Sequence, residues 1–215
     1  SEKCWDKQQT RQIRGGFKPI QRTGWVALTL ADWRQAQAAL CVRARPASIR
    51  NPSFKLKAMA LTHLLYLHGF RSSPQSTKAQ IVARWLAQHQ PSIRLWLPPL
   101  PPSPQAALRL IQAGVADWPS AQMAVVGSSL GGFYATVLAE QRSCRAVVLN
   151  PAIHPERDVA QHIGHHTHWH DPASAFDFLP QHVDELAAMQ APRLADPSRY
   201  AAVIAKGDEL LDWRE

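Results

Sequence analysis

The sequence predicts an α/β protein built on a doubly wound, mostly parallel sheet. Short apolar runs rich in branched residues alternate with segments whose apolar residues recur at helical spacing, and polar turns follow several of the runs. Strands that alternate with helices in this way form parallel sheets covered on both faces. The 215 residues are enough for one such domain with a full core.

The first 58 residues differ from the rest of the chain. They contain twelve lysines and arginines against three acidic residues, whereas residues 59–215 contain twelve against thirteen, so the net charge of +8 belongs to the N-terminal quarter. One short helix is expected over Thr29–Val42. Residues 1–58 are predicted to be a basic, poorly ordered extension, and the α/β domain is predicted over 59–215. Such a tail is usually solvated, so we expect no nucleic-acid role.

Cysteine usage and hydropathy give expectations about the compartment. The three cysteines, Cys4, Cys41 and Cys144, form no disulfide framework and have no metal-ligand spacing, which favours reduced thiols and a cytoplasmic protein. No run approaches the eighteen or so apolar residues of a membrane span, and the N-terminus lacks the apolar stretch of a secretion signal.

The first half of the domain contains three predicted elements and a rigid connection. A strand is expected over Leu61–Leu67, a helix around residues 81–86 and a strand over Ile93–Leu97. Five prolines between positions 98 and 104 require an extended link, because proline continues neither a helix nor a strand ladder. Pro104 suits the first turn of the next helix. A partner-binding proline motif is the alternative interpretation of this link.

Three further strands are predicted over Met123–Val126, Arg145–Leu149 and Tyr200–Ala205. Each runs into a turn that contains polar residues or glycine. The carboxyl ends of parallel strands meet at one edge of a sheet, where active sites of such folds lie. The stretch between the last two strands, about residues 152–195, is predicted to be a cap-like insertion.

The turn after Met123–Val126 has a pattern with chemical meaning. Ser129 stands between Gly127 and Gly131, after a β-branched run and before a helical pattern. A serine that must project from a sharp strand-to-helix turn needs very small neighbours two positions away on either side. The segment therefore predicts a nucleophile elbow, although an ordinary turn or a phosphate-binding loop fits these five residues equally well.

A second motif selects among these interpretations. The strand over Leu61–Leu67 ends in His68-Gly69-Phe70. Acyl transfer to a serine requires two donors that stabilise the developing oxyanion, usually the amide after the nucleophile and an amide in an early strand loop. Leu130 and Phe70 hold these two positions. The pair of motifs predicts a serine hydrolase.

The motifs together resemble the YqiA-like esterases of the α/β-hydrolase superfamily. The resemblance covers roughly Leu61–Arg214 and rests on four segments: residues 66–74, 127–135, 150–152 and 207–212. It implies hydrolysis of carboxylic esters, with acyl thioesters as a possible further class, by a cytoplasmic enzyme without a cofactor. Ser129 would be the nucleophile and Asp208 the acid of the triad. Asp212 is the weaker candidate for the acid and would instead cap a helix.

The resemblance also implies a catalytic histidine after one more strand beyond the acid. None of the ten histidines follows Asp208. The sequence is therefore interpreted as a piece that lacks the last strand, the catalytic histidine and a final helix, and it is expected to have slight activity by itself, because a serine without its base loses most of its activation. The alternative is a non-catalytic α/β-hydrolase-like binding or scaffold protein without a triad.

Five histidines cluster in the predicted insertion, at positions 162, 165, 166, 168 and 170. The favoured interpretation is a solvated, irregular segment; adventitious metal binding and a functional zinc site are the alternatives, and no metal is assigned. His68 is expected to fix its loop rather than act as a base. Trp85, Trp96 and Trp118 are expected in the core, and Trp169 near a substrate.

Overall fold

The structure is a computed structural model, and it describes residues 60–169, 171–189, 193–205, 208 and 211. The predictions made for residues 1–58, including the helix over Thr29–Val42, lie outside these residues. Within the described ranges, no helix combines the length and the apolar character that a bilayer crossing requires.

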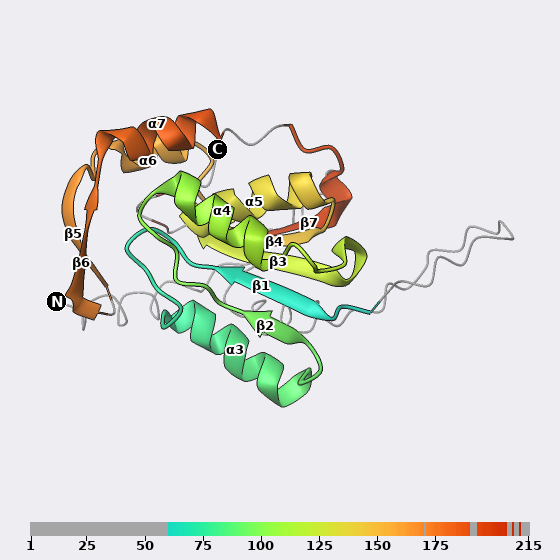
Figure 1. The fold of residues 1–215 in the computed structure, drawn as a ribbon. Helices are drawn as coiled ribbons and strands as arrows, with labels where there is room; N and C mark the ends of the chain where they lie inside the picture. Colours follow the sequence, from blue (N-terminus) through green and yellow to red (C-terminus); the bar gives the residue numbers. More distant parts are fainter. Residues whose placement is uncertain (1–59, 170, 190–192, 206–207, 209–210, 212–215) are drawn as a thin grey trace, which may run out of the picture.

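A five-stranded parallel sheet forms the centre of the domain (Figure 1). Its strands are arranged in the order β2-β1-β3-β4-β7. The chain therefore begins at the strand next to one edge, adds β2 at that edge, and then adds β3, β4 and β7 in turn on the other side of β1. This confirms the predicted fold class. The strands are β1 (His63–Leu67), β2 (Arg94–Trp96), β3 (Met123–Ser129), β4 (Arg145–Pro151) and β7 (Tyr200–Val203).

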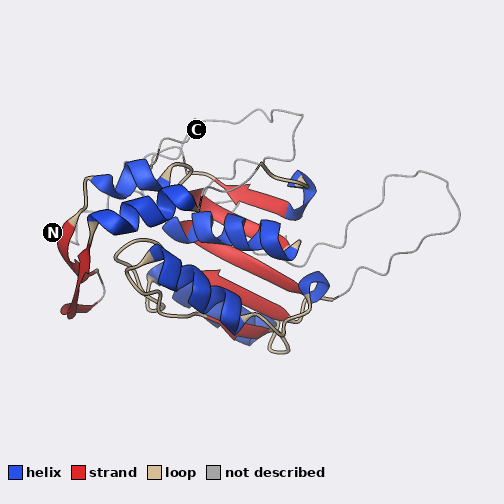
Figure 2. Ribbon diagram, turned by 45° about the horizontal axis from the view of Figure 1, so that its top comes forward, coloured by secondary structure: helices blue, strands red, loops and turns tan. Residues whose placement is uncertain are grey.

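Helices cover both faces of the sheet (Figures 1 and 2). Helix α3 (Thr77–His89) lies on one face, and α4 (Pro104–Gly114) and α5 (Leu130–Arg142) lie on the other. Alternate residues of a strand point to opposite faces. In β1, Leu65 and Leu67 therefore join the cluster formed with α4 and α5, whereas Leu64 and Tyr66 join the cluster formed with α3.

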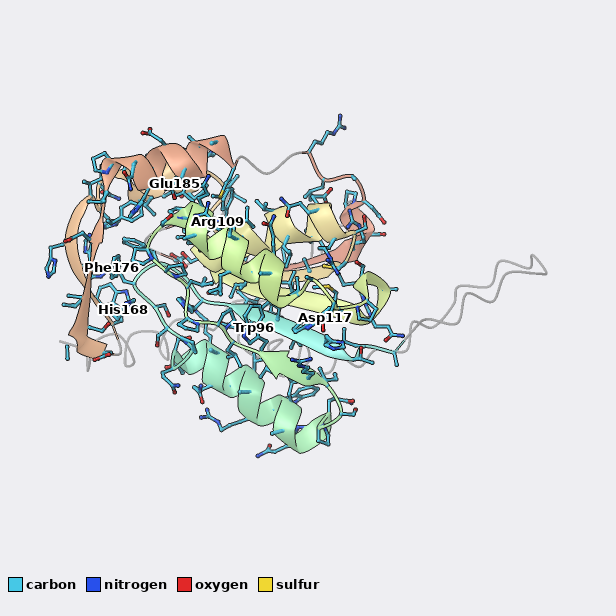
Figure 3. All side chains as sticks on the ribbon, viewed as in Figure 1. Trp96, Arg109, Asp117, His168, Phe176 and Glu185 are labelled. Carbon is cyan, nitrogen blue, oxygen red and sulfur yellow. The ribbon has the colours of Figure 1, made fainter. Side chains whose placement is uncertain are left out.

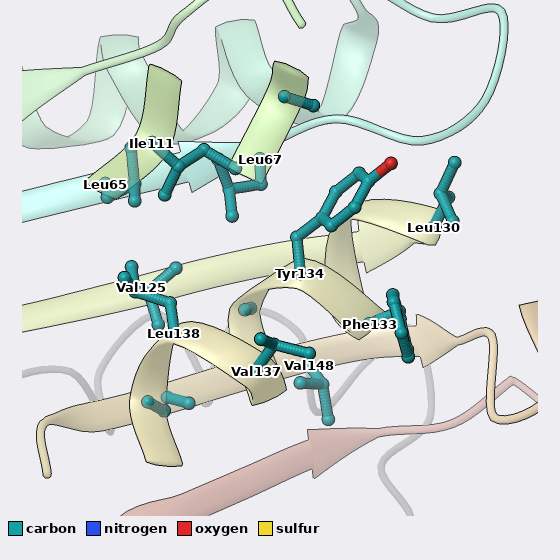
Figure 4. Packing of buried hydrophobic residues seen from close by; sticks show 14 of the residues in the cluster. Leu65, Leu67, Ile111, Val125, Leu130, Phe133, Tyr134, Val137, Leu138 and Val148 are labelled. Carbon is teal, nitrogen blue, oxygen red and sulfur yellow. The ribbon is translucent and has the colours of Figure 1, made fainter. Parts of the chain in front are cut away.

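The cluster beneath α4 and α5 is the larger of the two, and Figure 4 shows part of it. Ile111 of α4 and Leu138 of α5 are fully buried against Leu65 and Val125 of the two central strands. Strands buried on both faces carry apolar residues at successive positions, which is why they could be found as continuous apolar runs in the sequence.

Serines begin the two helices that flank β2. The Ser76 hydroxyl accepts a hydrogen bond from the Ala79 amide at the start of α3, and the Ser103 hydroxyl accepts one from the Ala106 amide at the start of α4. Pro104 is the first residue of α4, as its position predicted, because the missing amide hydrogen has no acceptor in the first turn of a helix.

The described residues between β4 and β7 form two short α-helices, a hairpin and the 3-10 helix η2 (Pro197–Arg199). Strands β5 (Gly164–His168) and β6 (Asp171–Phe178) pair antiparallel and make a separate two-stranded ribbon beside the main sheet (Figure 1). The expectation of an irregular segment is therefore wrong for this part of the chain, although the described residues of β5 are exposed or half-buried, as expected for a solvated segment. Helices α6 (Pro155–Ala160) and α7 (Pro180–Ala188) flank the ribbon in sequence.

Glu185 connects this segment to the body of the domain (Figure 3). Its carboxylate on α7 accepts hydrogen bonds from the Ser103 hydroxyl at 2.7 Å and the Gln105 amide at 2.9 Å, both at the start of α4. The first turn of a helix exposes amide donors that a carboxylate can accept. The contact fixes α7 above the edge of the sheet at which the strands end.

Candidate active site

Ser129 is the last residue of β3 and directly precedes α5. Its φ of 53° and ψ of −123° place it in a region that residues other than glycine rarely adopt. A β-carbon at Gly127 would lie 2.1 Å from the Gly131 carbonyl oxygen, and one at Gly131 would lie 2.1 Å from the Leu67 carbonyl oxygen. Only residues without a side chain fit at these two positions, as the spacing predicted.

The loop after β1 lies against this serine. A β-carbon at Gly69 would lie 3.1 Å from the Ser129 β-carbon and 3.6 Å from its hydroxyl oxygen. Phe70 follows Gly69 in the same loop, and Leu130 follows Ser129 as the first residue of α5. The two residues predicted to supply oxyanion donors are thus the chain neighbours of Gly69 and of Ser129, one in the loop after β1 and one in α5.

His68 holds the same loop through both of its ring nitrogens. The Leu100 amide donates to Nε2 at 3.2 Å, so the proton of the neutral ring is assigned to Nδ1, which donates to the Gly69 carbonyl at 3.0 Å. The side chain is buried, with 5% of the residue exposed. Burial is the main cause that lowers the pKa of His68, which favours this neutral form.

Asp208 lies beyond the end of β7 and is held by Asn150, the penultimate residue of β4. The Asn150 side-chain amide donates to the Asp208 carboxylate at 2.6 Å, and its oxygen accepts from the Ala205 amide at 2.8 Å. A third bond runs from the Leu211 amide to Asp208 at 3.2 Å. The rival acid Asp212 lies outside the described residues.

Asn150 is a site residue whose role was not apparent from the sequence. Its φ of 40° is left-handed, like that of Ser129 on the neighbouring strand. Just after β4, the Ala152 amide donates to the Ser129 carbonyl at 3.1 Å. The end of β4 therefore links the serine turn on one side with Asp208 on the other. The sequence feature that could have indicated this role is a polar residue at the end of a buried strand.

The histidines of the hairpin pack on aromatic rings near the loop after β1. His168 and Phe176 lie side by side, with ring centroids 5.0 Å apart (Figure 3). His166 lies 5.6 Å from Phe70, and its Nε2 contacts the carbonyl of His162 at 2.5 Å. His170 lies outside the described residues.

A metal site is not formed by the side chains that the structure describes. Among them, no group of three histidine, cysteine, aspartate or glutamate residues is close enough to hold an ion. His165 instead lies 2.9 Å from the Asp177 carboxylate across the hairpin, where both side chains are exposed.

Two solved structures have a fold similar to that of this chain. Mouse alpha/beta hydrolase domain-containing protein 10 is 12% identical to this chain, with a TM-score of 0.52, over 71% of this chain and 72% of its own. Est1E from Butyrivibrio proteoclasticus, solved with ferulic acid bound, is 15% identical, with a TM-score of 0.50, over 72% and 73%. These similarities establish the fold. Residues 63–215 match the Uncharacterised protein family UPF0227. The chain therefore belongs to this YqiA-like family, and its described part has an α/β-hydrolase-like fold.

Proposed function

We propose that this protein is a serine hydrolase of carboxylic esters, with acyl thioesters as a second substrate class. The observation that carries the proposal is the left-handed Ser129 between two obligatory glycines, with the Gly69 backbone beside its hydroxyl. A strained turn of this kind exposes a nucleophile at the edge of the sheet where the strands end.

In the proposed reaction, the Ser129 hydroxyl attacks the acyl carbonyl while a base takes its proton. The amides of Phe70 and Leu130 stabilise the oxyanion of the tetrahedral intermediate, and the position of Leu130 at the start of α5 adds the favourable field of a helix N-terminus. Collapse of the intermediate expels the alcohol or thiol, and water then releases the acid from the acyl-enzyme.

Asp208 is proposed to orient the catalytic histidine and to stabilise it when it is protonated. Its bonds from Asn150 and Leu211 hold the carboxylate in place for this role. The order Ser, Asp, His expected for this fold would place the base after Asp208 in the chain. The described histidines have other partners: His63, His68, His89, His154, His162, His165, His166, His168 and His182.

Labelling with a fluorophosphonate tests the proposal on the full-length protein. The probe is expected to modify Ser129, and Ser129→Ala is expected to abolish labelling and to lower ester hydrolysis by a factor of about 10³ or more. Ser92→Ala is the matched control, because Ser92 is exposed at the opposite end of the strands, before β2. Undiminished hydrolysis by the Ser129 variant would reject the mechanism, and an unlabelled, folded protein would favour a binding role.

A further inference from the structure

The loop after β1 contains a strained residue directly after Phe70. Arg71 has a φ of 57°, in the left-handed region. Strain of this kind persists only where surrounding contacts hold the residue. Three other described non-glycine residues have a positive φ: Ser129 and Asn150 belong to the candidate active site, and Ser143 ends α5. The positive φ of Arg71 therefore requires stabilising contacts with residues outside its own loop.

The β5–β6 hairpin supplies these partners. The Trp169 amide donates to the Arg71 carbonyl at 2.9 Å, and the Arg71 Nε donates to the Thr167 carbonyl at 3.1 Å. The guanidinium lies over the Trp169 ring, with Cζ 4.1 Å from the ring centroid. One residue further along, His168 Nδ1 lies 3.3 Å from the Ser72 carbonyl. Both the backbone and the side chain of Arg71 are thus held by residues about a hundred positions away.

The ring of Phe70 packs on the same segment. Phe178 lies 5.0 Å from it in an edge contact, and His166 approaches at 5.6 Å, also edge-on. Such edge contacts fix the orientation of a ring more strongly than apolar burial alone. Among the described residues, four rings contact Phe70: His162, His166, Phe176 and Phe178.

These contacts leave Phe70 between two fixed neighbours. On one side, a β-carbon at Gly69 would lie 3.1 Å from the Ser129 β-carbon, so the loop approaches the serine closely; on the other side, Arg71 is held by the hairpin. We propose that Arg71 is a positioning residue: by binding Thr167 and Trp169, it holds the Phe70 amide at the place where the oxyanion forms. The inference rests on the hydrolase function proposed above and extends it, because it makes the hairpin part of the catalytic apparatus.

Removal of the Arg71 side chain is expected to slow the chemical step. Loss of one oxyanion donor costs about 10²–10³ in kcat, and a displaced donor costs part of that. Arg71→Ala is therefore expected to lower kcat about 10- to 100-fold with little change in KM. Arg71→Lys is expected to lose nearly as much, because an ammonium group reproduces neither the planar stacking on Trp169 nor the bond from Nε.

Three comparisons separate positioning from a loss of folded protein. Arg71→Gly removes the same contacts but adopts a positive φ without strain, so its melting temperature should stay close to that of the wild type while its kcat falls. Trp169→Phe keeps a ring under the guanidinium and should retain more activity than Trp169→Ala. Arg84→Ala, an exposed arginine on α3, is the charge-matched control and should leave kcat unchanged.

A trifluoromethyl ketone matched to the acyl chain of the substrate gives the decisive measurement, because it binds as an oxyanion. Its affinity for the Arg71 variants should fall by the same factor as kcat/KM. The inference is overturned if Arg71→Ala and Arg71→Gly keep kcat within threefold of the wild type, or if they change only KM, which would make Arg71 a substrate contact. If the wild-type protein neither reacts with fluorophosphonate nor hydrolyses esters, the proposed function fails, and this inference fails with it.

Discussion

A single methyl group at Gly131 would disrupt the serine turn. The added β-carbon would meet the Leu67 carbonyl oxygen at 2.1 Å, and neither backbone can move without displacing β1 or α5. Gly131→Ala is expected to lower the free energy of unfolding by about 3 kcal/mol and to abolish labelling of Ser129. Chemical denaturation monitored by circular dichroism measures the change.

Gly164 offers a control for this substitution. Its φ is +136°, so Gly164→Ala introduces backbone strain, but the new methyl group would meet no atom within 4 Å. The variant is expected to lose only about 1 kcal/mol, from strain alone. Equal losses in the two variants would contradict the close approach at Gly131.

His68 makes the stability of the domain depend on pH. Because burial lowers the pKa of His68 in the folded protein, the unfolded chain binds a proton more readily. The stability that neutral His68 provides is complete above the ordinary value of 6.5 and is lost as the pH falls through the lowered value. The free energy of unfolding is therefore expected to decrease below pH 6.5.

Comparison with His68→Gln isolates this contribution from that of the other histidines. Denaturation of both proteins between pH 5 and 8 should show a smaller decline for the variant. NMR titration of the imidazole of His68 should show a neutral ring at pH 6.5. A steeper decline for the variant would contradict the lowered pKa of His68 in the folded protein.

Among single residues, the sequence could predict the roles that depend on residues close in the chain. The glycines around Ser129 act within five positions, so their spacing was readable. Asn150 acts on Asp208 across 58 positions, and its role follows only from the pairing of β4 with β7. A polar residue at a strand end fits either a turn or a site until the adjacent strand is known.

Among the contacts between elements, the one between α7 and α4 is the most open to experiment. Glu185 accepts two hydrogen bonds at the start of α4. Glu185→Gln keeps the shape but removes the charge, so the free energy of unfolding is expected to fall by about 1 kcal/mol. Differential scanning calorimetry measures the effect. Asp184→Asn changes an exposed residue on the same helix and should leave the free energy of unfolding unchanged. Equal shifts in the two variants would mean that the contact with α4 does not stabilise the domain.

The strands of the main sheet were predictable as elements, and the hairpin was not. The central strands β1 and β3 are buried on both faces, and β2, β4 and β7 also contribute apolar residues to both clusters, so their apolar runs stand out. In β5, the inward positions are held by histidines, with His166 and His168 against aromatic rings and His165 outside. Polar residues on both faces conceal the alternation that identifies a strand, so only the tertiary contacts with Phe70 and Phe176 explain why this segment is ordered.

For the molecule as a whole, the domain boundary is the main prediction. The two core clusters are built from residues between Leu61 and Ile204, and the family match begins at position 63. We therefore expect that removal of residues 1–59 from the full-length protein changes the melting temperature by less than about 2 °C, which corresponds to at most about 1 kcal/mol for a domain of this size.

Removal of residues 1–67 provides the contrast. This change deletes β1, which pairs with both β2 and β3, and it should leave no folded domain. Calorimetry and near-UV circular dichroism distinguish the two truncations. A loss of many degrees on removal of residues 1–59 would place part of the basic segment in the folded structure and would contradict the predicted boundary.

The bond between Arg71 and Thr167 joins residues 96 positions apart, and this separation has a consequence during synthesis. Contacts distant in sequence form late, since the loop that they close must first be ordered. On the ribosome, β1, β3 and the serine turn emerge well before the hairpin that clamps the Phe70 loop. Under the proposed mechanism, a nascent chain that ends shortly after α5 would therefore lack the hairpin that holds the Phe70 loop as well as Asp208, so Ser129 would be inactive until both have been synthesised and packed.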